Sequence, residues 1–150
     1  MTNRKGIRRH EALQPLSRHH MMGLHVGLKL PRAGTEESNI PTEQIIEDAM
    51  EFWCLGGQEH FREEEEVLLP AYALYEDIHQ PDIVEMLLEH VLIRSGMDEL
   101  CRGNISEEQM GELGELLHGH IRKEERILFP MIEQALPEEK LQELAPYLHD

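Results

Sequence analysis

The chain is poor in aromatic residues, Val and Thr, and contains only two cysteines. Aromatic residues make up 5% of its 150 residues, so a hydrophobic core has to be built mainly from Leu, Ile and Met. The scarcity of Val and Thr argues against a β-sheet. Cys54 and Cys101 lie far apart in the sequence without a Cys-x-x-Cys spacing, which indicates neither a disulfide framework nor a thiolate zinc site. We expect both to be buried, inert thiols.

Basic residues are also scarce, since 14 of them stand against 30 acidic residues and give a formal net charge of -16. Such a field repels a phosphate backbone or an anionic membrane surface, so we expect neither nucleic acid nor a membrane as a partner. No segment approaches the roughly 18 uninterrupted apolar residues of a membrane-spanning helix. The basic residues Arg4, Lys5, Arg8 and Arg9 are not followed by the apolar stretch of a signal peptide. We therefore expect a cytoplasmic protein in which residues 1–10 form a flexible arm.

Three segments rich in helix breakers divide the chain, at Pro31–Pro41, Asp77–Pro81 and Arg102–Asn104. Between them, apolar residues recur with helical periodicity. The pattern predicts four helices and a short fifth helix after Pro137. The four cover Glu11–Leu30, Thr42–Tyr75, Asp82–Cys101 and Ser106–Ala135. Short loops between amphipathic helices favour an all-α, up-down-up-down four-helix bundle, and this chain length fits a single domain, 1–150.

An internal repeat links the second and fourth predicted helices. His60–Pro70 (H-F-R-E-E-E-E-V-L-L-P) aligns without gaps on His120–Pro130 (H-I-R-K-E-E-R-I-L-F-P). The two segments agree at the His, the Arg, two Glu, one Leu and the Pro. Because Pro70 and Pro130 fall inside the helical patterns, we expect each to kink its helix.

Ionisable residues interrupt the apolar stripe of every predicted helix near its midpoint. In an antiparallel bundle with short loops the midpoints lie at about one level. The spacing of four residues between His and Glu in each repeat also places both side chains on one helix face. We therefore expect six inward-facing side chains to converge on one point: His20, His60, Glu64, His90, His120 and Glu124.

Two buried carboxylates are the observation that favours a metal site. A lone core His is often a hydrogen-bonded structural residue, and a ring of His and Glu held by hydrogen bonds alone is the plain alternative. Two inward Glu, each one turn from a His, need compensation by a cation or by protonation. Imidazole and carboxylate without thiolate suit iron, manganese or zinc, and six ligands suggest two ions. With both Glu bridging and an oxide or hydroxide between the ions, about two of roughly twelve coordination positions stay open for a small ligand.

Four spaced motifs resemble the hemerythrin-like, HHE cation-binding family. They are L-x-x-x-H (Leu16 to His20), the His60–Pro70 segment, E-H-x-x-I-R (Glu89 to Arg94) and the His120–Pro130 segment. The resemblance covers nearly the whole chain and implies a four-helix bundle with a non-haem di-iron centre. By motif position it implies ligand roles for the same six residues: His20, His60, Glu64, His90, His120 and Glu124.

The resemblance also implies which members of the family are most similar. Oxygen-carrying hemerythrins have a second His on the third helix, where this chain has Met86 and Arg94 at the two positions one turn from His90. It looks closer to the bacterial members with four His and two Glu. Some of these are linked to repair of iron-sulfur clusters under nitrosative stress and carry an N-terminal segment with a cysteine, which this sequence does not show.

The remaining polar residues of these helices are expected to lie outside the ligand set. We expect His19, His25 and His118 on the surface, and Glu63, Glu65, Glu66 and Glu125 to be solvated, unless one of these Glu accepts the free N–H of a ligand His. Arg94 is expected either to pair with a bridging carboxylate or to form a surface ion pair.

The sequence therefore predicts a protein with two iron ions, with zinc or manganese as alternatives, that binds dioxygen or nitric oxide for sensing, buffering or stress response. It favours a binding protein, as a monomer or homodimer, over an enzyme. The alternatives are an oxidoreductase acting on nitric oxide or peroxide, an iron donor for cluster repair, ferritin-like iron handling, and a purely structural bundle.

Overall fold

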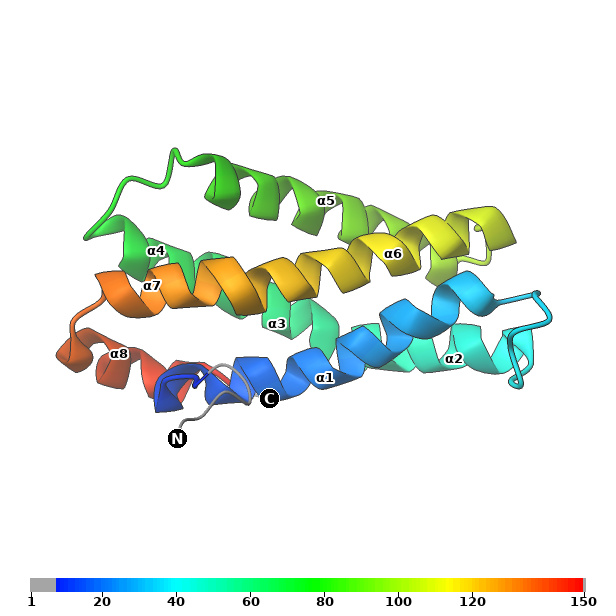
Figure 1. Ribbon diagram of the computed structural model, residues 1–150, viewed down its shortest axis with the longest axis horizontal. Helices are drawn as coiled ribbons and strands as arrows, with labels where there is room; N and C mark the ends of the chain where they lie inside the picture. Colours follow the sequence, from blue (N-terminus) through cyan, green and yellow to red (C-terminus); the bar gives the residue numbers. More distant parts are fainter. Residues whose placement is uncertain (1–7, 150) are drawn as a thin grey trace, which may run out of the picture.

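The computed structural model of the protein describes residues 8–149, and every regular element in this range is helical (Figure 1). Four long helical segments run antiparallel, each joined to the next at alternate ends of the molecule. The first and fourth segments pack side by side, as do the third and fourth, and the second contacts the first and third. The predicted up-down-up-down bundle is confirmed. No helix in residues 8–149 is long and apolar enough to cross a membrane.

The helix boundaries lie within two residues of the predicted ones. The first segment is α1 (Gln14–Lys29) with short 3-10 turns at Glu11–Leu13 and Leu30–Arg32, and the third is α5 (Pro81–Cys101). The second segment comprises α2 (Thr42–Phe52), α3 (Gln58–Glu63) and α4 (Leu69–Ala73). The fourth comprises α6 (Glu107–Lys123), which a Ser106–Gln109 capping box precedes, and α7 (Phe129–Ala135). The predicted fifth helix is α8 (Glu138–Leu144), followed by a 3-10 turn at Ala145–Tyr147.

Wide π-helical turns interrupt the second and fourth segments just before their prolines. They span Glu64–Leu68 and Glu124–Leu128, and a third one spans Trp53–Gly57. A proline has no N–H to continue the helical ladder, and the wide turn that ends two residues earlier accommodates this local break. Such turns are frequent at functional sites.

Two apolar clusters fill the bundle, one toward each end. Leu16, Leu68, Met86 and Leu128 belong to the cluster near α4, α7 and α8, whereas Val26, Phe52, Ile93 and Leu117 belong to the other. Each of the four segments contributes to both clusters. A buried polar layer lies between them and contains all six predicted ligands.

The inward face of α1 differs from the prediction. The spacing of large apolar residues in the sequence predicts an inward stripe through Leu24 and Leu28, but Leu28 is exposed, and Gly23 and Gly27 are buried instead. A Cβ on Gly27 would lie 3.0 Å from the backbone oxygen of Gly114 on α6. The glycines thus form the contact face because they let the two backbones approach closely.

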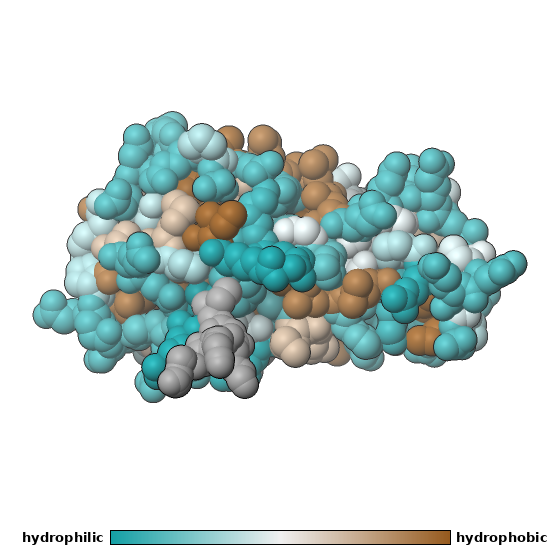
Figure 2. Space-filling view, viewed as in Figure 1, coloured by the Kyte–Doolittle hydropathy of each residue, from teal (hydrophilic) through white to brown (hydrophobic). Residues whose placement is uncertain are grey.

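Hydrophilic side chains cover most of the face shown in Figure 2. Arg9 and His10, expected in a flexible arm, contact the fourth segment and α8: Arg9 donates to the backbone oxygen of Glu125 at 2.6 Å, and His10 lies 2.9 Å from a carboxylate oxygen of Glu138. Arg4 and Lys5 lie outside the described residues.

Replacing Gly114 by Ala is expected to disturb the contact between α1 and α6. A Cβ there would lie 2.6 Å from Pro31, 2.8 Å from Leu30 and 2.9 Å from Gly27, and overpacking of this kind costs about 1–3 kcal/mol. At Gly119 on the same helix an added Cβ meets nothing within 4 Å. Gly119→Ala should therefore stabilise by about 0.5–1 kcal/mol. Urea unfolding measures both, and equal effects would contradict this packing.

Candidate metal centre

The structure brings the six predicted ligands together in the polar layer between the two apolar clusters. Each of the four segments supplies one His, and the second and fourth also supply one Glu each. All six side chains are buried, with no more than 4% of any residue exposed. His20, His60, Glu64, His90, His120 and Glu124 form two groups in which one nitrogen or oxygen atom from each residue lies within 4.8 Å of all the others.

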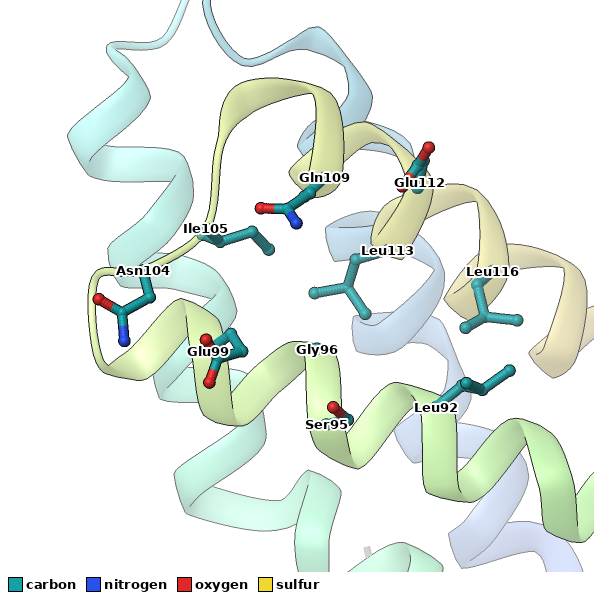
Figure 3. A pocket seen from close by; sticks show the side chains of 10 residues that line it. All are labelled: Leu92, Ser95, Gly96, Glu99, Asn104, Ile105, Gln109, Glu112, Leu113 and Leu116. Atoms are coloured by element: carbon teal, nitrogen blue, oxygen red, sulfur yellow. The ribbon is translucent and has the colours of Figure 1, made fainter.

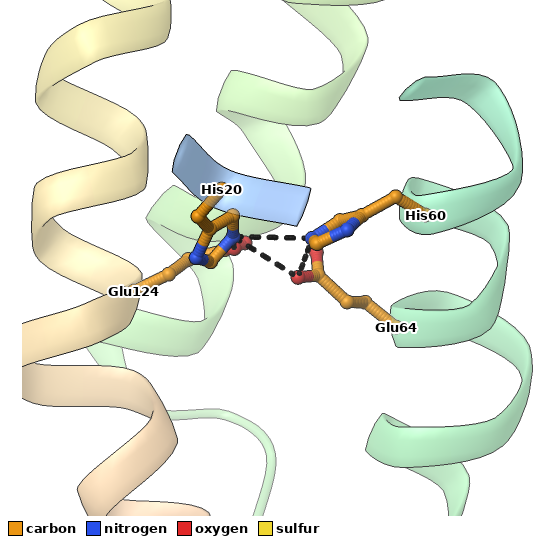
Figure 4. Close-up of side chains that lie close together, drawn as sticks. All are labelled: His20, His60, Glu64 and Glu124. Carbon is orange, nitrogen blue, oxygen red and sulfur yellow. Dashed lines mark hydrogen bonds and ion pairs between the residues drawn. The ribbon is translucent and has the colours of Figure 1, made fainter. Parts of the chain in front are cut away.

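The first group combines His20 and His60 with both carboxylates (Figure 4). The Nε2 atoms of the two imidazoles lie 3.1 Å apart. Nε2 of His20 lies 2.9 Å from Oε1 of Glu124, and Nε2 of His60 lies 2.8 Å from Oε2 of Glu64. The Nε2 lone pairs and one oxygen of each carboxylate therefore point to one small volume.

The second group combines His90 and His120 with the same two carboxylates. Nε2 of His90 lies 3.1 Å from Oε1 of Glu64 and 3.2 Å from Oε2 of Glu124. Nε2 of His120 lies 2.8 Å from Oε2 of Glu124. Glu64 and Glu124 thus turn one oxygen to each pair of imidazoles, which is the arrangement of bridging carboxylates.

Two buried polar atoms of this cluster lack a hydrogen bond: Oε1 of Glu64 and Nε2 of His120. Their short distances to neighbouring atoms lack hydrogen-bond geometry, and a buried polar atom without a hydrogen bond is costly in a core. A shared cation compensates both atoms without requiring a hydrogen. The donor set and its geometry therefore fit metal ions.

Carboxylates outside the cluster hold three of the four imidazoles through Nδ1. Nδ1 of His20 lies 2.6 Å from Glu125, Nδ1 of His90 lies 2.6 Å from Glu65, and Nδ1 of His120 lies 2.8 Å from Glu89. Such contacts fix the tautomer that leaves Nε2 free to bind a metal and raise the basicity of the ligand. Glu65 and Glu125 occupy equivalent positions in the repeat, a signal that could have separated them from Glu63 and Glu66, with which the prediction grouped them.

A basic side chain in turn binds each of these three carboxylates. Arg9 lies 2.9 Å from Glu125, Arg94 lies 2.8 Å from Glu65, and Lys123 lies 3.0 Å from Glu89. Arg94 therefore pairs with the partner of His90, and not with a bridging carboxylate as one reading of the sequence had it.

The fourth imidazole, His60, has a different partner. Its Nδ1 lies 3.2 Å from Nδ1 of His19, which the sequence placed on the surface and which is buried in the structure. The His19 ring stacks on Phe52 and on His60, with ring centroids 5.3 Å and 5.0 Å apart. Prediction missed His19 because the true inward face of α1 is turned toward its glycines.

Other expectations for polar residues hold only in part. His25 and Glu66 are exposed, and His118 is half-buried. Glu63, expected to be solvated, is buried and accepts a hydrogen bond from the backbone N–H of His149 at 2.9 Å.

The two cysteines also differ from the prediction. Cys54 is exposed and Cys101 is half-buried. Partial burial, together with the neighbouring thiol of Cys54, raises the pKa of Cys101.

The carboxylates raise the pKa of His20, His90 and His120 in the metal-free protein. Burial disfavours each imidazolium, but the surrounding carboxylates outweigh burial and raise the pKa of His20 and His120 to about 9 and that of His90 to about 11. Burial likewise opposes ionisation of Glu124, yet the imidazoles hold its pKa well below its usual range. Protons therefore occupy the metal-free cluster at neutral pH, and metal binding has to release them.

Two surface hollows differ in whether a residue of the centre lines them. One of about 450 Å³ is lined by His20 together with Ser17, Met21, Leu24 and Glu125, so it leads to one ligand from the side of α1. Another of about 420 Å³ lies between α5 and α6, where Leu92, Gly96, Leu113 and Leu116 line it (Figure 3). None of the six residues of the centre lines the second hollow.

The metal-free protein is expected to lose stability as the pH rises. An imidazole whose pKa is higher in the folded than in the unfolded state stabilises the folded state when it is protonated. This stabilisation is complete below the ordinary pKa of about 6.5. It is lost as the pH rises past the folded-state pKa values of about 9 for His20 and about 11 for His90. Urea unfolding in chelator at about pH 6 and about pH 10 measures this loss, which should shrink in His20→Gln and persist in His25→Gln. A free energy of unfolding that rises over this interval would contradict the assignment.

Comparison with known proteins identifies the family. Residues 16–132 match the hemerythrin HHE cation binding domain, a range that includes all six residues of the centre. No curated protein and no solved structure matches the chain. The chain therefore belongs to the hemerythrin HHE cation-binding family, and its buried His and Glu cluster offers the donor atoms that a metal ion needs.

Proposed function

We propose that the protein is a non-haem di-iron protein that binds a diatomic molecule, dioxygen or nitric oxide, for sensing, buffering or stress response. The observation that carries this proposal is the pair of four-residue groups that share Glu64 and Glu124. A single ion would need only one such group of four residues. Two groups with common carboxylates are what a pair of neighbouring ions requires.

Each ion would be held by two imidazoles and by one oxygen of each carboxylate. His20 and His60 would hold one ion, and His90 and His120 the other. Imidazole and carboxylate donors without a thiolate suit iron, although zinc and manganese accept the same set. When bound, the iron pair supplies open coordination positions for a diatomic ligand.

The side chains around the proposed ions add no further imidazole donor and exclude bulk water. Met86, one turn before His90, is fully buried in the apolar cluster, and Arg94, one turn after it, binds Glu65. Neither position supplies a fifth imidazole. Fully buried Leu68 and Leu128 in the same cluster, each four residues beyond a bridging carboxylate, exclude bulk water, so a small uncharged ligand is favoured over a large polar substrate.

Metal analysis of variants tests the carboxylate bridge. Glu124→Ala removes an oxygen from both groups, so the protein should lose most of its iron, falling from about two ions per chain to fewer than one. The matched control is Glu66→Ala, because Glu66 is exposed and lies outside both groups. Retention of two ions by Glu124→Ala would contradict the proposal.

Optical spectroscopy tests ligand binding. Protein loaded anaerobically with ferrous iron and then exposed to air should show near-ultraviolet oxo-bridge absorption that changes when nitric oxide or azide is added. A folded protein whose spectrum does not change when nitric oxide or azide is added would contradict the proposed binding of a diatomic ligand. Steady-state consumption of nitric oxide or peroxide with a reductant would instead assign the centre to an oxidoreductase, and transfer of iron to an apo iron-sulfur protein would assign it to iron donation.

A further inference from the structure

The four imidazoles of the centre do not all have the same kind of residue at Nδ1, and the internal repeat helps to locate the difference. Glu125 and Glu65, equivalent in the repeat, bind His20 and His90. The residue that precedes His90 is Glu89, which binds His120. The residue that precedes His20 is His19, which binds His60. The bundle thus has a pseudo-two-fold relation between its halves, and an imidazole stands at position 19 where the other half has a carboxylate.

The contact fixes the hydrogen-bonding state of His19. If the Nε2 lone pair of His60 is to bind a metal, its Nδ1 carries the proton and donates it to Nδ1 of His19. His19 then accepts as a neutral imidazole. A neutral acceptor transfers less electron density to the donor ring than a carboxylate does, so His60 is a weaker ligand than the three imidazoles held by Glu.

The surroundings of His19 hold it in this role. A Cβ on Gly56, in the wide turn Trp53–Gly57, would lie 2.6 Å from Nε2 of His19. The ring fills the space that the missing side chain leaves, between Phe52 and His60. The imidazole is therefore a positioned component of the centre and not a polar residue that happens to be buried.

We propose that His19 makes the two metal positions unequal, so that the position of His20 and His60 binds its ion more weakly and loads second. This inference rests on the proposed di-iron centre. Carboxylates support both imidazoles of the position formed by His90 and His120. At the other position Glu125 supports His20 and the imidazole of His19 supports His60. The chain therefore passes through a state with one ion held by His90 and His120, and the ion held by His20 and His60 is the one that exchanges.

Anaerobic titration of the metal-free full chain with ferrous iron tests the inequality in the wild type. Calorimetry should resolve two binding steps, and a competing chelator should remove one ion at a concentration at which the other remains bound. Two steps of equal affinity would overturn the inference while leaving the di-iron proposal intact. Absence of iron binding would overturn both.

Substitution of His19 tests the cause. The oxygen of Asp or Asn and Nδ1 of His are all attached to Cγ, so either substitution places an acceptor oxygen close to the position of Nδ1. His19→Asp should tighten the weaker step about tenfold or more, and His19→Leu should weaken it by about 10–100-fold, with the tighter step unchanged. His19→Asn supplies a neutral acceptor and should restore the weaker step relative to His19→Leu.

Two controls separate this role from a general effect on the fold or on charge. His25→Asp makes the same change of residue at an exposed position of α1 and should leave both steps in place. Circular dichroism before titration reports whether each variant is folded. A weaker step that is the same in His19→Asp, His19→Leu and the wild type, or a tighter step that moves with them, would overturn the proposal.

Discussion

The structure depends on the burial of two carboxylates, Glu64 and Glu124, with no solvent exposure between two apolar clusters. An isolated carboxylate in such surroundings is strongly disfavoured. Four imidazoles approach these two groups from four helical segments, and they compensate the charge in one of two ways. In the metal-free chain three of them, His20, His90 and His120, have a raised pKa and carry protons; in the proposed metal-loaded chain they would give up those protons and bind the ions together with the carboxylates.

The outer residues connect this layer to the neighbouring helical segments. Chains of imidazole, carboxylate and basic side chain run outward from His20, His90 and His120, and each of these chains links different segments of the bundle. Part of the acidic excess of the sequence therefore has a structural place, because Glu65, Glu89 and Glu125 each contact an imidazole and a basic side chain. The net charge of -16 is therefore a poor guide to binding partners. The buried acidic residues Glu64 and Glu124 are more informative about function.

The sequence was sufficient for the fold and for the six-residue cluster because the ligands interrupt regular patterns. On α5, helical periodicity places Ile83, His90, Ile93 and Met97 on one face with either Met86 or Leu87, and the first four are buried together with Met86. Prediction was weaker where small residues decide the packing. On α1 the glycines form the contact face. Periodicity counted over large apolar residues therefore placed the inward face of this helix at a slightly wrong rotation, and the prediction missed His19.

Contacts between distant helices were also beyond reach of the sequence. The approach of Cys54 to Cys101 depends on how α5 lies against the second segment, and the wide turns that begin at Glu64 and Glu124 depend on hydrogen bonds that periodicity does not encode. The supporting carboxylates are an intermediate case. Glu65 and Glu125 share a repeat position, which the sequence shows, but the imidazoles they bind come from other helices.

Anomalous diffraction at the iron absorption edge from crystals of the iron-loaded protein tests the central claim most directly. The account predicts two peaks inside the polar layer, one bound by His20 and His60 and the other by His90 and His120, with Glu64 and Glu124 bridging them. A single peak, or peaks that the two carboxylates do not join, would contradict it.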